Sequence, residues 1–304
     1  MKIGLSSYSM DNLMQSGEMT ILDVMRFAKE NGAEHIELVP FGFTLVDDKT
    51  GVFNEELITA IKAKSAELSL PISNYAVLGD LLKPDRDAYL DEVERLKLHI
   101  DVAEKLGIKQ MRHDVSSFRR PLETNTQLDF EREFPQMVEA CRTLADYAAD
   151  YGITTLVENH GFFVNGSDRV IRLVEEVDRK NFRMVVDTGN FACMDECCEI
   201  AVKKCMPYAD MIHLKDFYIR KTSSLPSIGG LFRCDSGNWF STVSGYSMLR
   251  GSILAQGDLE IGEMIATIKE YGFEGYVSIE FEGMEDPRAG SIAGLQAARY
   301  YTER

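Results

Sequence analysis

The chain has 304 residues, of which 45% are hydrophobic and 27% charged, and its formal net charge is −16. This composition is ordinary for a globular protein and excludes a disordered or collagen-like chain. The acidity argues against a nucleic-acid partner, because a negative protein repels phosphate backbones and no run of Lys or Arg exceeds two residues.

Nothing in the sequence indicates a membrane protein or a secreted one. The first residues lack an apolar signal segment, and no stretch of eighteen apolar residues occurs. We therefore expect a cytoplasmic protein without a membrane partner. The six cysteines are then expected to be free thiols, and the spacing of the cluster at 193–205 does not match a paired zinc-binding motif.

Eight short segments rich in Val, Ile and Leu recur along the chain. Strands that are buried on both faces have this continuous apolar character, which is typical of a parallel sheet. The predicted strands cover residues 3–8, 34–39, 72–77, 108–113, 153–158, 183–187, 210–214 and 276–281.

A segment of helical period follows each predicted strand. The predicted helices cover residues 20–31, 54–69, 86–106, 130–151, 167–180, 195–206, 258–271 and 288–302. Eight strand–helix units predict an α/β fold, a single (β/α)8 TIM barrel that spans residues 1–304 as one domain. A dinucleotide-binding fold has no support, because no GxGxxG follows the first strand.

The strand–helix alternation is interrupted once, between Asp216 and Asp258, where no helical period is found. Loops of this length in a compact domain are usually functional. We expect residues 217–255 to form a loop inserted after the seventh strand, over the C-terminal face where active sites of barrels lie. Arg250 could bring a planar hydrogen-bond donor from this loop to a substrate.

Four of the predicted strands end in a residue that can bind a metal ion. Taken singly, such a residue is more often a helix cap or a salt-bridge partner. Three carboxylates that converge on one edge would repel each other, and a divalent cation would remove that cost. One imidazole with three carboxylates suits Mn²⁺, Mg²⁺, Co²⁺ or Zn²⁺. The four residues are Glu158, Asp187, His213 and Glu280.

The motifs LVENHG, VVDTGN, IHLKD, QGDLEI and VSIEFEG occur in this order along the chain. This series resembles the xylose-isomerase-like TIM-barrel superfamily of sugar (phosphate) isomerases and epimerases, which also includes endonuclease IV-like enzymes. The resemblance implies one divalent metal ion, with Mn²⁺ expected first, held by Glu158, Asp187, His213 and Glu280. The endonuclease branch is disfavoured, because it needs more histidines than the five present.

In the epimerases of this superfamily, the two glutamates also act as an acid/base pair. The resemblance therefore implies catalytic roles for Glu158 and Glu280, which would transfer a proton through an enediolate. The chain departs from the epimerase pattern at Asn190, where those enzymes often carry a histidine. Further candidates for substrate contacts are Glu37, His113, His160, Asn190, Lys215 and Arg250.

The leading hypothesis is a metal-dependent isomerase or epimerase of a small sugar or sugar phosphate. One alternative is the large subunit of a C-glycoside-cleaving enzyme, which acts on a 3-keto sugar and would use the same site with a β-rich partner. Another is a sugar-binding barrel without catalysis, since a fold alone does not fix function. A homo-oligomer, dimer or tetramer, is plausible for any of these.

Overall fold

Eight parallel strands form a closed barrel in the computed structural model, which describes residues 1–120, 122–224 and 239–304. Around the barrel the order is β1-β11-β7-β6-β5-β4-β3-β2, so the first and last strands pair directly. The predicted (β/α)8 barrel is therefore confirmed. Its strands are β1 (Lys2–Ser6), β2 (Ile36–Leu38), β3 (Ile72–Val77), β4 (Gln110–His113), β5 (Thr154–Glu158), β6 (Phe182–Asp187), β7 (Ala209–Leu214) and β11 (Tyr276–Ile279).

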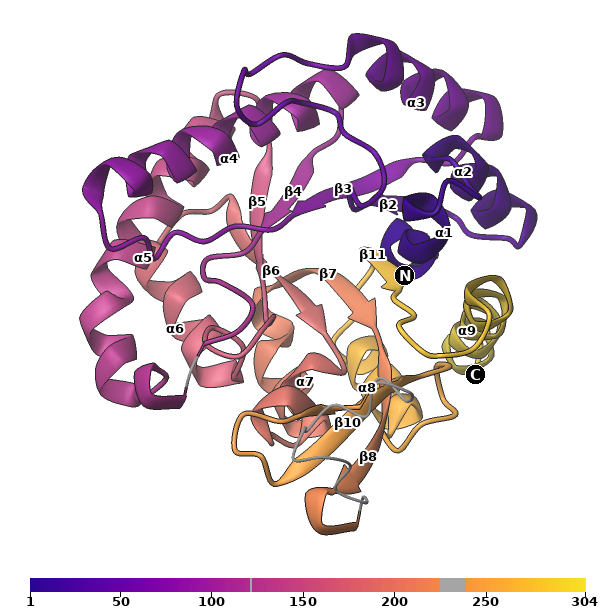
Figure 1. Ribbon diagram of the computed structural model, residues 1–304. Helices are drawn as coiled ribbons and strands as arrows, with labels where there is room; N and C mark the ends of the chain where they lie inside the picture. The colour runs from indigo at the N-terminus through magenta and orange to yellow at the C-terminus, as the bar shows by residue number, and fades with distance from the viewer. Residues whose placement is uncertain (121, 225–238) are drawn as a thin grey trace.

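Helices surround the strands as an outer layer (Figure 1). Two of them, α2 and α5, begin with a capping box in which a threonine and an aspartate three residues later satisfy each other's backbone N–H groups. No helix among the described residues is long and apolar enough to cross a membrane. The helices are α1 (Asp11–Gln15), α2 (Ile21–Glu30), α3 (Glu55–Leu68), α4 (Arg86–Leu106), α5 (Gln127–Ala149), α6 (Ser167–Val177), α7 (Cys198–Cys205), α8 (Ile261–Glu270) and α9 (Pro287–Thr302).

The interior of the barrel changes from apolar to polar along the strands. Leu156, Val185 and Met211 form a small buried cluster inside the barrel, against Tyr276. Side chains of a strand alternate between its two faces. The residues two positions further along each of these strands therefore also point inward. The strand ends at the C-terminal edge consequently place their polar residues in the barrel, where they form the candidate site.

The insertion after β7 contains a small antiparallel sheet, where the sequence predicted a loop. Its strands are β8 (Asp216–Lys221), β9 (Phe240–Ser241) and β10 (Ser247–Ser252), in the order β8-β10-β9. In Figure 1 this sheet projects to one side of the barrel, at the bottom of the view. Part of the predicted insertion, residues 225–238, lies outside the described residues.

Backbone contacts join the insertion to the rest of the protein. Val243 donates its N–H to the carbonyl of Cys193 at 2.8 Å. The buried Asp216 carboxylate accepts from the backbone of Gly257 at 2.8 Å, which ties the start of the insertion to its end. A Cβ on Gly251 would lie 2.3 Å from the carbonyl oxygen of Glu282, so only glycine allows β10 to lie this close to the segment after β11.

Candidate metal centre

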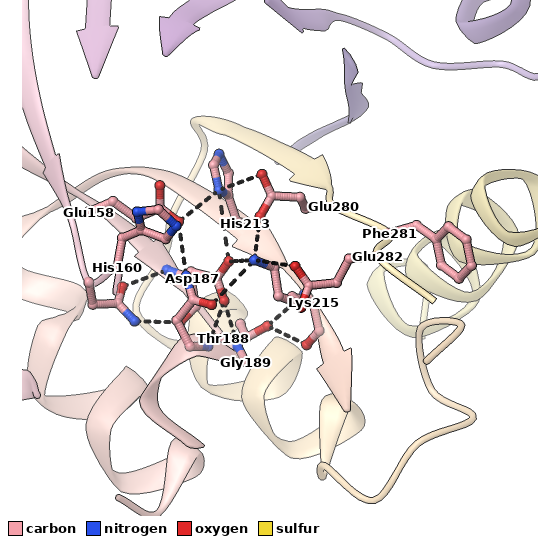
Figure 2. Close-up of polar contacts among 12 residues, drawn as sticks. Glu158, His160, Asp187, Thr188, Gly189, His213, Lys215, Glu280, Phe281 and Glu282 are labelled. Carbon is pink, nitrogen blue, oxygen red and sulfur yellow. Dashed lines mark hydrogen bonds and ion pairs between the residues drawn. The ribbon is translucent and has the colours of Figure 1, made fainter. Parts of the chain in front are cut away.

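The four predicted ligands converge inside the C-terminal end of the barrel. Glu158 ends β5, Asp187 ends β6, His213 lies in β7 and Glu280 follows β11. One ligand atom from each lies within 4.8 Å of the others. Asp187 and His213 are at most 1% exposed, and Figure 2 shows Glu158 and Glu280 on the two sides of His213.

Two atoms at the centre of this cluster lack a hydrogen bond. Nδ1 of His213 and Oδ2 of Asp187 are both buried, and neither has a hydrogen-bond partner in the described part of the chain. Nδ1 lies 3.4 Å from a carboxylate oxygen of Glu158 and 3.8 Å from one of Glu280. Oδ2 of Asp187 also lies 3.2 Å from Nζ of Lys215. Buried polar atoms are nearly always satisfied, and a cation at the centre would satisfy both of these atoms. Three carboxylates and one imidazole suit a divalent metal ion, and the residues present therefore fit one.

The electrostatics of the cluster are those of a site with excess negative charge. Burial raises the pKa of Asp187 to about 6, with Lys215 opposing the shift and Glu158 adding to it. Burial alone would lower the pKa of His213, but the neighbouring carboxylates, Glu37 foremost, raise it well above its usual value. A cation at the centre would oppose both pKa shifts, because it compensates the charge of the carboxylates and favours a neutral imidazole.

Each of the two glutamates turns one oxygen to the cluster and binds a buried cation with the other. Oε2 of Glu158 lies 2.7 Å from Nε of Arg112, and Oε2 of Glu280 lies 2.6 Å from Nζ of Lys215. Burial would raise the pKa of Glu158, but Arg112 and His213 hold it well below its usual range. Arg112 thus helps to keep Glu158 ionised, as a proton-accepting group requires.

Three of the predicted substrate-contact residues line the cavity above the cluster. Asn190 donates to Glu158 at 3.1 Å and lies 3.3 Å from Nζ of Lys215 through its amide oxygen. His160 holds its Nδ1 at 3.0 Å from the Asp114 carboxylate and also faces the cavity. Asn190, His160 and Lys215 therefore lie where a substrate would meet them.

The other three predicted contacts, Glu37, His113 and Arg250, do not line the cavity. Glu37 is completely buried and contacts His213 instead. His113 is also fully buried, with Nδ1 3.1 Å from the backbone carbonyl of Asp114 and its ring near Phe182. The guanidinium of Arg250 lies 5.0 Å from the ring centres of both Tyr218 and Trp239, within the insertion. The structure places these three residues outside the cavity lining, and their contacts with a substrate stay predictions.

Arg112, Asp114 and Glu282 belong to the site although the sequence predicted no role for them; Glu282 lines the cavity and lies 3.5 Å from Lys215. Arg112 bridges two buried carboxylates, because Nη2 lies 2.6 Å from Asp114 and Nε reaches Glu158. Strand pairing explains why Arg112 and not His113 faces the site: Arg112 pairs with the inward Leu156, whereas His113 pairs with Val157 in the outer core. Alternation along β5 identifies Leu156 as inward, but the step from Leu156 to Arg112 requires the register of β4 against β5.

The cavity has a volume of about 790 Å³ and opens above the cluster. Its floor contains Glu158, His213, Lys215 and Glu280, and its walls come from loops that follow several strands of the barrel. The walls of the cavity include Tyr8, Phe41, Lys49, Leu78, Arg95, Phe118, Phe217 and Phe240.

A protein-family model described as xylose isomerase-like TIM barrel matches residues 25–301. The chain belongs to this family. The match confirms the resemblance that the motifs indicate. For this xylose isomerase-like barrel, the family defines the fold and the common position of the site, whereas the reaction has to be argued from the residues themselves.

Proteins of several activities are similar to this xylose isomerase-like barrel. An inosose dehydratase of Geobacillus thermodenitrificans is 22% identical over 224 residues, which are 70% of either chain. The structure of a probable 3-DHS dehydratase from Bacillus anthracis has a TM-score of 0.71 at 18% identity, and covers 98% of this chain and 99% of its own. The 3-keto-D-glucoside 4-epimerase of E. coli has a TM-score of 0.68 at 16% identity, with 99% of both chains covered.

Proposed function

We propose that this protein is a divalent-metal-dependent isomerase or epimerase that moves the proton next to the carbonyl group of a small sugar. The observation that carries the proposal is the pair formed by Glu158 and Glu280. Each directs one oxygen toward the four-ligand cluster and has its other oxygen bound to a buried cation. The 3-keto-D-glucoside 4-epimerase among the structural neighbours supports the same class of substrate.

Glu158, Asp187, His213 and Glu280 would hold the metal ion. When bound, the ion would supply Lewis-acid polarisation of the carbonyl and of a neighbouring hydroxyl, which acidifies the C–H bond between them. Mn²⁺ is the ion we expect first, because it accepts oxygen-rich ligand sets with one imidazole.

Glu158 and Glu280 would carry out the proton transfer from two sides of the cluster. One glutamate takes the proton from carbon and the other returns a proton to the opposite face, as epimerisation requires. Lys215 lies 2.6 Å from Glu280 and lines the cavity, so its ammonium group also neutralises charge that develops on a substrate oxygen. Asn190 donates to Glu158 and thereby fixes the direction of its carboxylate.

Elimination is the second candidate, and the 22% identical inosose dehydratase favours it. Removal of water, or of the aglycone of a C-glycoside, begins with the same proton abstraction and differs in the next bond to break. His160, held by Asp114 at 3.0 Å, is the residue that would protonate the leaving oxygen or carbon. An elimination forms an unsaturated product that absorbs in the ultraviolet. An epimerisation forms no such product.

Solvent deuterium tests the proposal. The Mn²⁺-loaded protein is incubated in D₂O with ketoses, keto-cyclitols and 3-oxo-glucosides, and carbon-bound deuterium is measured by NMR. We expect incorporation next to the carbonyl, lost on chelation and restored by Mn²⁺. Glu280→Gln should lower the rate at least about 100-fold, because an amide cannot accept the proton, while the exposed Glu274→Gln serves as the control. Product formed at full rate without carbon-bound deuterium would overturn the proton-transfer mechanism.

A further inference from the structure

The cavity is larger than a free monosaccharide needs. Cavities of about 300–1,000 Å³ hold drug-sized ligands, and this one measures about 790 Å³. The metal cluster occupies only its floor. A sugar ring bound there through its carbonyl and hydroxyl groups would leave much of the volume between the cluster and the mouth to another part of the substrate.

The walls above the cluster are rich in aromatic rings, which come from separate segments of the chain. The ring centres of Tyr8 and Phe41 lie 5.8 Å apart, and those of Phe217 and Phe240 lie 5.7 Å apart. Phe118 lies 5.0 Å from the ring of His160. We call Tyr8, Phe41, Phe118, Phe217 and Phe240 the aromatic wall. All five line the cavity.

Part of this apolar surface is open to solvent. Phe118 is 44% exposed, and Leu78, which also lines the cavity, is 48% exposed. Large apolar side chains at the mouth of a ligand cavity gain free energy when a ligand covers them, because apolar surface leaves water. This part of the cavity therefore suits an apolar group, preferably a ring that can stack.

Three of the four Lys and Arg side chains that line the cavity are paired with carboxylates. Arg112 is paired with Glu158, and Lys215 with Glu280. Arg95 binds Glu92 at 2.8 Å and Asp48 at 3.3 Å. Of the cations that line the cavity, only Lys49 has no carboxylate partner among the described residues.

Two arginines that do not line the cavity form cation–π contacts with aromatic rings. Arg119 lies over Phe118 and Phe162, and Arg250 over Tyr218 and Trp239. A phosphate group would have to compete with carboxylates for Arg95, Arg112 and Lys215, and recognition of phosphate normally uses several free donors. The cavity thus favours an uncharged substrate.

We propose that the substrate is an uncharged oxo-glycoside whose anomeric substituent is an aromatic or other apolar ring, seated against the aromatic wall. This inference rests on the proposed proton transfer for the position of the sugar at the metal cluster. A glycosidic bond locks the anomeric carbon, so the ring cannot open to a free aldehyde or ketone there. The carbonyl whose neighbouring proton moves must then be an oxo group on another carbon of the sugar ring.

Three matched probes test the inference: phenyl 3-oxo-β-D-glucoside, methyl 3-oxo-β-D-glucoside and the 6-phosphate of the methyl compound. Binding to the Mn²⁺-loaded protein is measured by calorimetry, which needs no turnover. We expect the phenyl compound to bind about five- to tenfold more tightly than the methyl compound, as for a buried aromatic contact. The phosphate should bind more weakly than its unphosphorylated parent.

Substitution of the aromatic wall should weaken binding of the phenyl compound more than binding of the methyl compound. Phe118→Ala should lower the phenyl-to-methyl affinity ratio, and Phe240→Ala should lower it independently. Tyr300→Ala changes an equally exposed aromatic residue of α9 and should have no effect.

Equal affinities for the phenyl and methyl compounds, absence of phenyl binding, or tighter binding of the phosphate would each overturn the inference. The proposed function fails separately, by absence of deuterium exchange. Selective phenyl binding without exchange would retain the aromatic subsite and reject the reaction.

Discussion

The carboxylate of Glu37 lies 2.9 Å from Nε2 of His213, on the side of the imidazole away from the other ligands. This contact leaves Nδ1 to face Glu158 and Glu280. Histidines that bind metal ions usually donate their second N–H to a carboxylate, which fixes the tautomer and makes the ligand more basic. Glu37 thus orients His213, the predicted metal ligand, although the sequence suggested a contact with sugar.

Glu37→Ala should weaken metal binding about 10- to 100-fold, as is typical when such an orienting partner is removed. Mn²⁺ affinity measured by competition with a chelator checks this expectation. Asn74→Ala is the matched control, because Asn74 donates to Glu37 at 2.8 Å and is one contact further from the metal. Its effect should be smaller. An unchanged affinity in Glu37→Ala would show that His213 is oriented by other contacts.

Asp187→Ala should remove most of the bound metal, because it deletes one of the three carboxylates of the four-ligand cluster. His113→Asn should retain the metal, since the His113 ring lies outside the cluster, near Phe182. Elemental analysis of both purified variants provides the comparison. Full occupancy in the Asp187 variant would be incompatible with the assigned ligand set, and so would metal loss in the His113 variant.

Arg112→Met should destabilise the metal-free protein by about 3–5 kcal/mol at neutral pH, the usual cost of breaking a buried ion pair. Arg112 helps to depress the pKa of Glu158. A depressed carboxyl pKa contributes stability above the unfolded-state pKa of about 4.3 and loses it as the pH falls through the folded-state pKa. The difference between wild type and variant should therefore be largest near pH 7 and shrink in acid. Urea unfolding at several pH values measures it, and a pH-independent difference would contradict the ion-pair explanation.

We still predict that the insertion, residues 217–255, covers the site. Lys221 pairs with Ser247 in the β8–β10 ladder, so an Asn-Gly turn can replace residues 222–246 and preserve the hairpin. This change removes Phe240 from the cavity wall. We expect KM to rise and kcat to fall at an unchanged circular dichroism spectrum, because the substrate becomes more accessible to water. Unaltered kinetics would assign the insertion to a role outside catalysis.

Much of this architecture can be predicted from the sequence, because it depends on local signals. Continuous apolar segments define the eight strands of the barrel, and a parallel barrel brings their C-terminal ends to one face. Glu158, Asp187, His213 and Glu280 close such segments, so their convergence follows from topology alone. The structure brings their ligand atoms together as that argument requires.

The features that the sequence analysis missed depend on pairing between distant segments. Arg112 and His113 are neighbours, and only the register of β4 against β5 decides which of them faces inward. The ladder between β8 and β10 joins segments separated by a long stretch without helical period, so each strand alone resembles a loop. Glu37 likewise meets His213 across 176 residues of sequence.

The close approach at Gly251 limits how freely the insertion after β7 can be replaced by another sequence. β10 touches the backbone of Glu282 with no side chain between them, two residues after Glu280, a predicted metal ligand. A foreign insertion grafted onto this scaffold would therefore displace the segment that carries Glu280 unless it kept glycine at the point of contact. Loop exchange, whether in the laboratory or in evolution, is expected to succeed only when the insertion and the segment after β11 are transferred as one unit.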